Sequence, residues 1–353
     1  MSNDLKVLIC YNEPVKAYQN YIGKKCSSLG ENIDLSETEI ADHINDLVSS
    51  LQIYFQNVDT CVFRADIEDT ISRITSFSPD VIFNFVESIE GNANFEAYAA
   101  GLYELMGYSY TGNTPLCLAT CLDKSRTKRI LHSFGIKTPG FMIAKYKEKI
   151  KPESFNLKFP VILKLLNEDA SIGISEFSVV NDIDEINRRL VFLFRTYKQD
   201  VLVEEYIDGR ELNVAILGGK ALPISEISFN GLPEGLPKIV TYEGKWSPES
   251  VYFKNTNPIC PAKNLDVETK DKVVKIAERC FEIMNCRDYA RIDIRLSKEN
   301  IPYVIEVNPN PDLSTDAGFA RAAAASEISY AELLFRILNF ALERRENDKK
   351  VKA

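Results

Sequence analysis

The stretch Arg291-Ile-Asp-Ile-Arg295 is followed, after a short polar turn, by Tyr303-Val-Ile-Glu-Val-Asn-Pro-Asn310. Successive side chains of a β-strand point to opposite faces, so Arg291 and Asp293 share one face of the first strand. By the same alternation, Glu306 and Asn308 share a face of the second strand. Two carboxylates and an amide are hard oxygen ligands of the kind that Mg²⁺ prefers. The stretch therefore predicts a hairpin with Asp293, Glu306 and Asn308 as candidate metal ligands.

The other face of this predicted hairpin is apolar. Its side chains are Ile292, Ile294, Ile305 and Val307. We therefore expect one face in the core, while polar groups on the other face would be costly to bury unpaired. An ordinary half-exposed antiparallel hairpin has the same pattern, so this stretch alone leaves both interpretations open.

The composition is that of a globular protein. The 353 residues are enough for two or three domains, with 45% hydrophobic and 26% charged residues. The net charge of -9 does not indicate a basic surface that would bind nucleic acid. No segment approaches the roughly 20 apolar residues that span a bilayer, and the first residues do not resemble a signal peptide. We expect a cytoplasmic protein without nucleic-acid or membrane partners.

The cysteines and histidines argue against two kinds of site. Eight cysteines are scattered at positions 10, 26, 61, 117, 121, 260, 280 and 286 without a Cys-x-x-Cys pair, which indicates buried, reduced thiols. Cys117 and Cys121 are one helical turn apart, but a zinc site needs further ligands. The only histidines are His43 and His132. Zinc binding and histidine catalysis are therefore disfavoured.

Strand and helix patterns divide the chain into three parts. The expected strands are 5–10, 79–86, 160–164 and 201–207, and the expected helices are 94–106, 123–134, 266–284 and 329–344. The alternation of strands and helices predicts a doubly wound α/β domain over residues 1–117. A central α+β subdomain is expected over 118–203, and a C-terminal subdomain over 204–353.

The sequence also predicts the structure of three further segments. Asp208-Gly209 predicts a hairpin turn between the strand 201–207 and a strand over 210–217. Residues 230–258 are rich in Gly and Pro and long for a connection, which favours a lid over a disordered insert. The charged residues 345–353 are expected to fray.

Further motifs accompany the opening stretch in a fixed order. They are Tyr110-Thr-Gly-Asn113 before Asp123-Lys124, Phe159-Pro-Val-Ile-Leu-Lys164, Leu202-Val-Glu-Glu-Tyr-Ile-Asp-Gly-Arg-Glu-Leu-Asn-Val-Ala215, Leu222-Pro-Ile-Ser-Glu-Ile227 and Cys260-Pro-Ala262. From about Val81 to Leu342 the chain resembles the ATP-grasp fold and, within it, the D-alanine:D-alanine ligase group. This resemblance implies a three-domain α/β fold with ATP between the central and C-terminal domains.

The resemblance also implies how ATP would be bound. It places Lys124, Lys164, Ser171, Gly173 and Lys245 at the phosphates, Glu204, Glu205 and Ile207 at the adenine, and Glu211 at the ribose. Ammonium groups offset phosphate charge, and carboxylates accept hydrogen bonds from amino and hydroxyl groups. Without the resemblance, each lysine would be expected at a solvated surface position. Glu204 and Glu211 would likewise be expected to form a solvent-facing pair on a hairpin.

For the chemistry, the resemblance implies an ADP-forming carboxylate:amine ligase. Asp293, Glu306 and Asn308 match positions for two Mg²⁺ ions, for which Mn²⁺ could substitute, and Arg291 would stabilise the phosphoryl group. For Arg291 alone, a surface ion pair is the alternative. ATP would phosphorylate a substrate carboxylate, and an amine would attack the acyl phosphate. The partners implied are small molecules, in particular amino acids. Family members often form homodimers through the first domain, which residues 1–117 neither support nor exclude.

The resemblance fails at the substrate positions. The departures are Glu13 and Glu87 in the first domain, Ala170 in the loop 166–174 (the phosphate loop), Trp246 in the lid, and Asp312 and Ala317 after the hairpin. Asp312 and Asp316 would attract a cationic amine, or instead cap the turn or helix after Pro311. These changes favour substrates other than two D-alanines. The alternatives are D-alanine:D-alanine ligation and a nucleotide-binding regulator without turnover.

Overall fold

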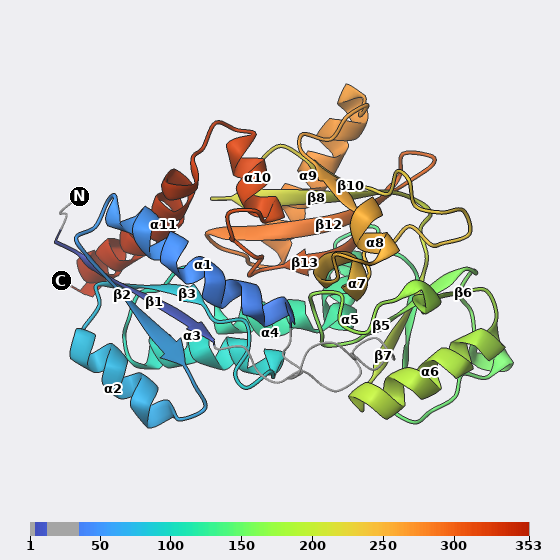
Figure 1. The fold of residues 1–353 in the computed structure, drawn as a ribbon, viewed down its shortest axis with the longest axis horizontal. Coiled ribbons are helices and arrows are strands. Elements are labelled where there is room, and N and C mark those ends of the chain that lie inside the picture. The colour runs from blue at the N-terminus through green and yellow to red at the C-terminus, as the bar shows by residue number, and fades with distance from the viewer. Residues whose placement is uncertain (1–3, 13–34, 353) are drawn as a thin grey trace.

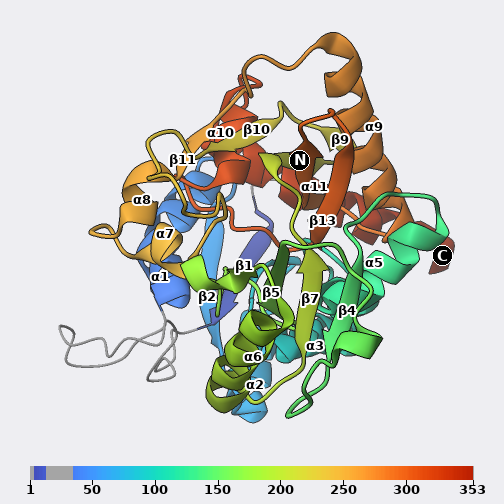
Figure 2. The same cartoon turned by 90° about the vertical axis from the view of Figure 1, so that its right-hand side faces the viewer.

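A computed structural model describes residues 4–12 and 35–352 of the chain. In this part of the chain the strands form three sheets, and helices pack beside each of them (Figure 1). The second sheet lies below the third in the view of Figure 2. None of the described helices is long and apolar enough to cross a bilayer.

The first sheet is parallel, with strand order β2-β1-β3. Its strands are β1 Lys6–Asn12, β2 Asn57–Phe63 and β3 Val81–Phe85, and the accompanying helices are α1 Leu35–Gln52, α2 Ile67–Phe77, the 3-10 turn Ala93–Phe95 and α3 Glu96–Leu105. The central strand β1 is a run of buried apolar residues from Val7 to Cys10, because helices cover both faces of such a sheet. The predicted alternation of strands and helices in this part is observed.

The second sheet is antiparallel, with strand order β4-β7-β5-β6. Its strands are β4 Phe141–Ala144, β5 Val161–Leu165, β6 Val179–Val180 and β7 Val201–Glu205, with α4 Pro115–Leu122, α5 Lys124–Ser133, α6 Ile183–Tyr197 and the 3-10 turns Pro152–Ser154 and Glu176–Ser178. Asp182 caps the N-terminus of α6, and its side chain accepts a hydrogen bond from Glu185 N. It buries Ile186 and Leu190 in the core of this sheet.

The third sheet has the strand order β11-β10-β8-β12-β13, and β9 pairs with β8. Its strands are β8 Gly209–Leu217, β9 Lys220–Ala221, β10 Ser225–Ser228, β11 Asn257–Ile259, β12 Tyr289–Ser297 and β13 Pro302–Asn308, with α7 Tyr242–Trp246, α8 Val251–Asn255, α9 Val267–Ile283, α10 Gly318–Ala324 and α11 Tyr330–Lys352. Arg291 pairs with Asn308, and Asp293 with Glu306, so the predicted hairpin is observed.

The predicted hairpin across Asp208-Gly209 is wrong. Strand β7 pairs with β4 and β5 in the second sheet, whereas β8 pairs with β10 and β12 in the third. The backbone at Gly209 passes close to that of Leu296. Only glycine fits there, because a Cβ at this position would lie 2.0 Å from the carbonyl oxygen of Leu296. Asp208-Gly209 therefore connects a strand of the second sheet to a strand of the third sheet.

Two smaller predictions also need correction. The register shifts between Asp293 and Ile294, so an irregularity interrupts the alternation of β13. Val304 is consequently in the core, and Ile305 is only partly buried and lines the cleft described below. The predicted fraying of residues 345–353 is not observed in the described part, since α11 continues to Lys352.

The core of the first sheet is completed from the far end of the chain. Helix α11 packs against α1 and β3, and its Leu334 and Leu338 share a core with Val7 and Phe83. The predicted domain boundaries after residues 117 and 203 stay predictions.

Candidate active site

A cleft of about 690 Å³ brings together residues of the second and third sheets. The predicted site residues that line it are Glu87, Lys124, Lys164, Ser171, Glu204, Glu205, Ile207, Glu211, Lys245, Trp246, Arg291, Asp293, Glu306, Asn308 and Asp312. Gly173 is not among the lining residues. It supports the loop instead, with a φ of +75° and a carbonyl that accepts a hydrogen bond from Arg189. Glu13 lies outside the described residues.

Glu204 stands on β7 at one end of the cleft and is only 1% exposed. Its Oε1 accepts a hydrogen bond of 3.0 Å from Lys128 Nζ, and Lys164 Nζ lies 3.3 Å from Oε2. Burial opposes ionisation, but Lys128 and Lys164 hold the pKa of the Glu204 carboxyl below its usual value. Oε2 is buried without a hydrogen-bond partner in proper geometry. A donor such as the adenine amino group would satisfy this oxygen.

Glu211 is held on β8 by a buried arginine. Arg295 Nη1 lies 3.0 Å from Glu211 Oε2, and Arg295 Nε donates to the carbonyl of Ile207 at 3.0 Å. Arg295 also donates to Tyr206 Oη and to the carbonyl of Lys238, which belongs to the predicted lid. One guanidinium therefore connects the predicted ribose-binding residue, the adenine-binding segment and the lid. Glu205, next to Glu204, accepts a hydrogen bond from Lys158 N on the outer side.

Lys124 is the first residue of α5 and is buried at the predicted phosphate end. Its Nζ donates to the carbonyl of Glu168 and, at 3.0 Å, to Asp169 Oδ1. Burial lowers the pKa of Lys124, but Asp169 and Glu306 outweigh this effect and raise it above the usual value. The side chain is therefore a permanent cation beside a loop whose Ser171 has a positive φ of 60°.

The lid contributes Lys245 and Trp246 from the short helix α7. Burial, followed by the nearby charge of Arg291, lowers the pKa of Lys245. Trp246 Nε1 lies 3.4 Å from the carbonyl oxygen of Ala170. The indole of Trp246 therefore packs the lid onto the loop that contains Ala170.

The paired strands β12 and β13 place the candidate metal ligands side by side. Arg291 binds Asp293 through two hydrogen bonds of 2.8 Å, and Asn213 Nδ2 donates to Asp293 Oδ1 at 2.7 Å. Burial raises the pKa of Glu306, an effect that Asp169 and Asp293 reinforce against Lys124. Asn308 Oδ1 accepts a hydrogen bond from Asn310 N. Closely spaced acidic and amide oxygens fit a hard divalent cation, which would relieve the repulsion between the carboxylates.

The cleft also contains residues that depart from the resemblance. Asp312 Oδ1 accepts hydrogen bonds from the backbone and side chain of Ser314, so the capping alternative describes its contacts. Asp316 does not cap α10, whose N-cap is Ala317. Arg321 lines the cleft beside these residues, and its Nε is buried without a hydrogen-bond partner.

Several residues of the site were missed from the sequence. They are Lys128, Asp169, Asn213, Arg295, Glu96 and Arg321. Two had a usable signal, since Lys128 is one helical turn after Lys124 and Asn213 shares a strand face with Glu211. Glu96, the first residue of α3, had none, because it reaches the cleft only through the packing of the first sheet on the loop after β13. Burial raises its pKa to about 8, although Asn310 donates to it at 2.8 Å.

Comparisons with known proteins agree with this geometry. A sequence model of a family described as "D-ala D-ala ligase C-terminus" matches residues 130–339. An uncharacterized protein, y4sG of Sinorhizobium fredii, is 33% identical over 75% of each chain. The D-alanine–D-alanine ligase of Bordetella pertussis is 31% identical over 71% of this chain and 76% of its own length.

The structure of the D-alanine–D-alanine ligase from Bacillus anthracis complexed with ATP matches 97% of this chain and 99% of its own, with a TM-score of 0.74 and 23% identity. This likeness confirms the predicted three-domain ATP-grasp fold. The sequence relatives and the family match show the family as well as the fold. The chain belongs to the D-alanine–D-alanine ligase family of ATP-grasp proteins.

Proposed function

We propose that the protein is an ADP-forming ligase that uses ATP to join a small-molecule carboxylate to an amine. The observation that carries the proposal is the convergence in one cleft of Lys124, Lys164 and Lys245 with the three oxygen ligands of β12 and β13. Phosphoryl transfer depends chiefly on positioning and charge stabilisation, and this set of side chains supplies both.

The nucleotide is bound between Glu204 and the phosphate loop. The adenine amino group donates to Glu204 Oε2, which has Lys164 nearby as an ion-pair partner but no hydrogen bond in proper geometry, and Glu211, held by Arg295, accepts from the ribose hydroxyls. Lys124 and Lys164 offset the phosphate charge. Because Lys124 already binds Asp169, a phosphate oxygen takes over part of that interaction when ATP enters.

Asp293, Glu306 and Asn308 would hold two Mg²⁺ ions, or Mn²⁺ in their place. The bound ions would neutralise charge on the β- and γ-phosphates. Arg291 reaches the same region and keeps its charge, since Asp293 and Glu306 outweigh the effect of burial and raise its pKa. Because Nε and Nη2 donate to Asp293, Nη1 is the donor that this proposal assigns to the transferring phosphoryl group and to the oxyanion that forms afterwards.

The reaction proceeds in two steps. A carboxylate oxygen of the first substrate attacks the γ-phosphorus, the bond to the bridging oxygen breaks, and ADP leaves. The amine of the second substrate then attacks the acyl carbon, loses a proton, and expels phosphate. The lid residues Lys245 and Trp246 close over the phosphate loop and exclude water, which would otherwise hydrolyse the acyl phosphate.

The substrates are amino acids or similar molecules other than a pair of D-alanines. Ala170 and Ala317 offer no hydroxyl to a substrate, and Asp312 adds a carboxylate to the cleft. Arg321 supplies a cation in the same region, with Nε buried and unpartnered, so it suits the carboxylate of the amine-bearing substrate. The relatives named D-alanine–D-alanine ligase favour dipeptide formation from D-alanine as the second candidate.

The test is a screen for ADP release with pairs of amino acids and other carboxylates and amines, followed by mass spectrometry of the products. We expect an amide product with at least one pair. Glu306→Gln and Asn308→Ala should abolish ADP formation, whereas Glu299→Gln, in the exposed turn between the same two strands, should not. ATP binding without an amide product from any pair would support a regulator instead. Efficient dipeptide formation from D-alanine alone would establish the second candidate.

A further inference from the structure

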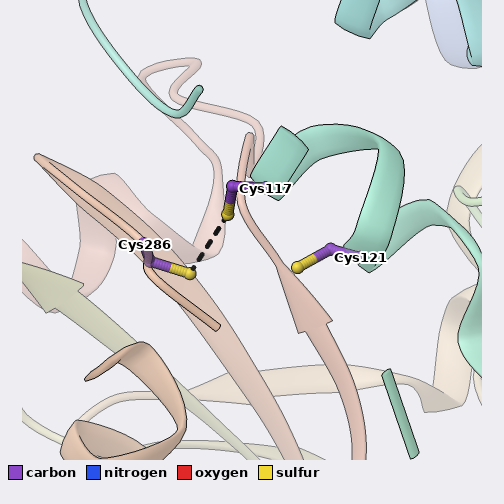
Figure 3. A group of neighbouring side chains, drawn as sticks. All are labelled: Cys117, Cys121 and Cys286. Carbon is purple, nitrogen blue, oxygen red and sulfur yellow. Dashed lines mark hydrogen bonds between the residues drawn. The ribbon is translucent and has the colours of Figure 1, made fainter. Parts of the chain in front are cut away.

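Three buried cysteines converge beside the cleft, outside the predicted ATP and metal positions (Figure 3). Cys117 and Cys121 are one turn apart on α4, and Cys286 lies in the loop between α9 and β12. They are 2%, 4% and 9% exposed, so all three thiols are shielded from bulk solvent. The Sγ atoms of Cys117 and Cys286 are 3.7 Å apart, and all three sulfurs lie within 4.8 Å of one another.

These distances match the requirements of a metal ion with three sulfur ligands. A metal–sulfur bond of about 2.3 Å places the sulfurs about 3.8 Å apart in tetrahedral geometry and about 4.0 Å apart in trigonal geometry. The observed separations of 3.7 Å and up to 4.8 Å bracket both values. Small side-chain rotations would bring all three sulfurs into one coordination sphere.

The surroundings select the kind of ion. The three cysteines belong to an apolar core with Leu131 and Ile292, which excludes a hydrated hard cation. Within the described residues, no fourth histidine, cysteine or carboxylate joins the group, whereas closed zinc sites use four protein ligands. Three thiolates without a fourth ligand suit a soft monovalent ion, Cu(I).

An entry path and a nearby positive charge complete the site. Cys121 lines the cleft together with Leu118 and Leu122, so an ion can reach the sulfurs from there. Arg287 follows Cys286 in the chain and carries the nearby positive charge, and its Nε donates to the carbonyl of Gly112. Asn113 Oδ1 lies 3.5 Å from Cys117 Sγ and also accepts from Arg287 N, which holds the loop of Cys286 against α4.

We propose that Cys117, Cys121 and Cys286 form a binding site for one Cu(I) ion. Binding displaces thiol protons to solvent and involves no change of oxidation state. Because α4 packs against β13, which carries Glu306 and Asn308, the bound ion ties this helix to the strands of the candidate active site. The site is independent of the proposed ligase reaction, since its three ligands are outside the nucleotide and metal positions.

The test uses the reduced full-length protein, titrated with Cu(I) without oxygen against a chromophoric Cu(I) chelator. We expect one ion per chain, with sulfur ligands at about 2.3 Å in X-ray absorption. Cys117→Ser, Cys121→Ser and Cys286→Ser should each weaken binding by about 10-fold to 100-fold or more. Cys280→Ser is the matched control, because Cys280 is buried in the same core but does not belong to the group, and its affinity should be unchanged.

A second measurement does not depend on the folding of variants. Cu(I) should protect Cys117, Cys121 and Cys286 from an alkylating reagent in the wild-type chain under partial denaturation, while Cys280 is modified at its usual rate. Absence of a retained ion, equal losses in the Cys280 control, or protection spread evenly over all cysteines would overturn the site. Retention of Zn²⁺ in preference to Cu(I) would overturn the choice of ion.

Discussion

The carboxyl group of Glu96 gives the most quantitative prediction. It is 8% exposed, faces the cleft, and accepts a hydrogen bond of 2.8 Å from Asn310 Nδ2. Burial raises its pKa from 4.5 to about 8, which corresponds to about 5 kcal/mol at about 1.36 kcal/mol per pH unit. The carboxyl is consequently protonated in the folded protein at neutral pH and ionised in the unfolded chain.

The sign of the pH dependence follows from proton binding. Between about pH 4.5 and pH 8 the folded state binds more protons at Glu96 than the unfolded state, so stability falls as the pH rises through this range. From about pH 5 to about pH 8 this one group removes about 4 kcal/mol from the free energy of unfolding.

The perturbation is Glu96→Gln, which keeps the oxygen that accepts from Asn310 and removes the ionisable group. Urea unfolding followed by circular dichroism at about pH 5 and about pH 8 measures the effect. We expect similar stabilities of variant and wild type at the lower pH, and a variant more stable by up to about 4 kcal/mol at the higher pH. Glu268→Gln, an exposed acid on α9, is the control. A difference between Glu96→Gln and wild type that does not change with pH would refute a neutral buried carboxyl.

Two further variants test contacts of the cleft. Lys128→Met leaves buried Glu204 with Lys164 as its remaining cation, so the free energy of unfolding should fall by about 3–5 kcal/mol in chemical denaturation; a loss below about 1 kcal/mol would contradict the pairing. Arg321→Met should raise KM for the amine substrate by about 10-fold or more with little change in kcat, since it removes a charged hydrogen-bond donor. Arg279→Met, at an exposed arginine of α9, is its control, and an unchanged KM for both substrates would exclude the proposed contact.

The sequence predicted the parts of the site that depend on local periodicity. Arg291 and Asp293 were expected on one face because strand side chains alternate, and the short polar turn indicated the hairpin. The register that pairs Arg291 with Asn308 and Asp293 with Glu306 comes from the structure. The ATP-grasp fold was predicted from the order of the motifs, and the structural likeness confirms it. The roles assigned to individual residues stay predictions.

The parts that were missed depend on long-range packing. Asp208-Gly209 has the composition of a hairpin turn, but the sequence does not reveal that Gly209 must pass the carbonyl of Leu296 on a distant strand. The partner of Cys117 and Cys121 could not be found either, because Cys286 is 165 residues beyond Cys121 and approaches α4 only through the loop before β12. The irregularity that moves Ile305 out of the core likewise has no signal in a regular apolar alternation.

The packing of α11 on the first sheet has a consequence for biosynthesis. The strands β1, β2 and β3 are synthesised well before Leu334 and Leu338 of α11, which complete their core. Until then the apolar face of the sheet lacks its cover, and nascent chains expose a surface that chaperones recognise and that promotes aggregation. The first sheet is therefore expected to reach its final packing only after α11 has been synthesised, so that deletion of α11 would destabilise β1, β2 and β3.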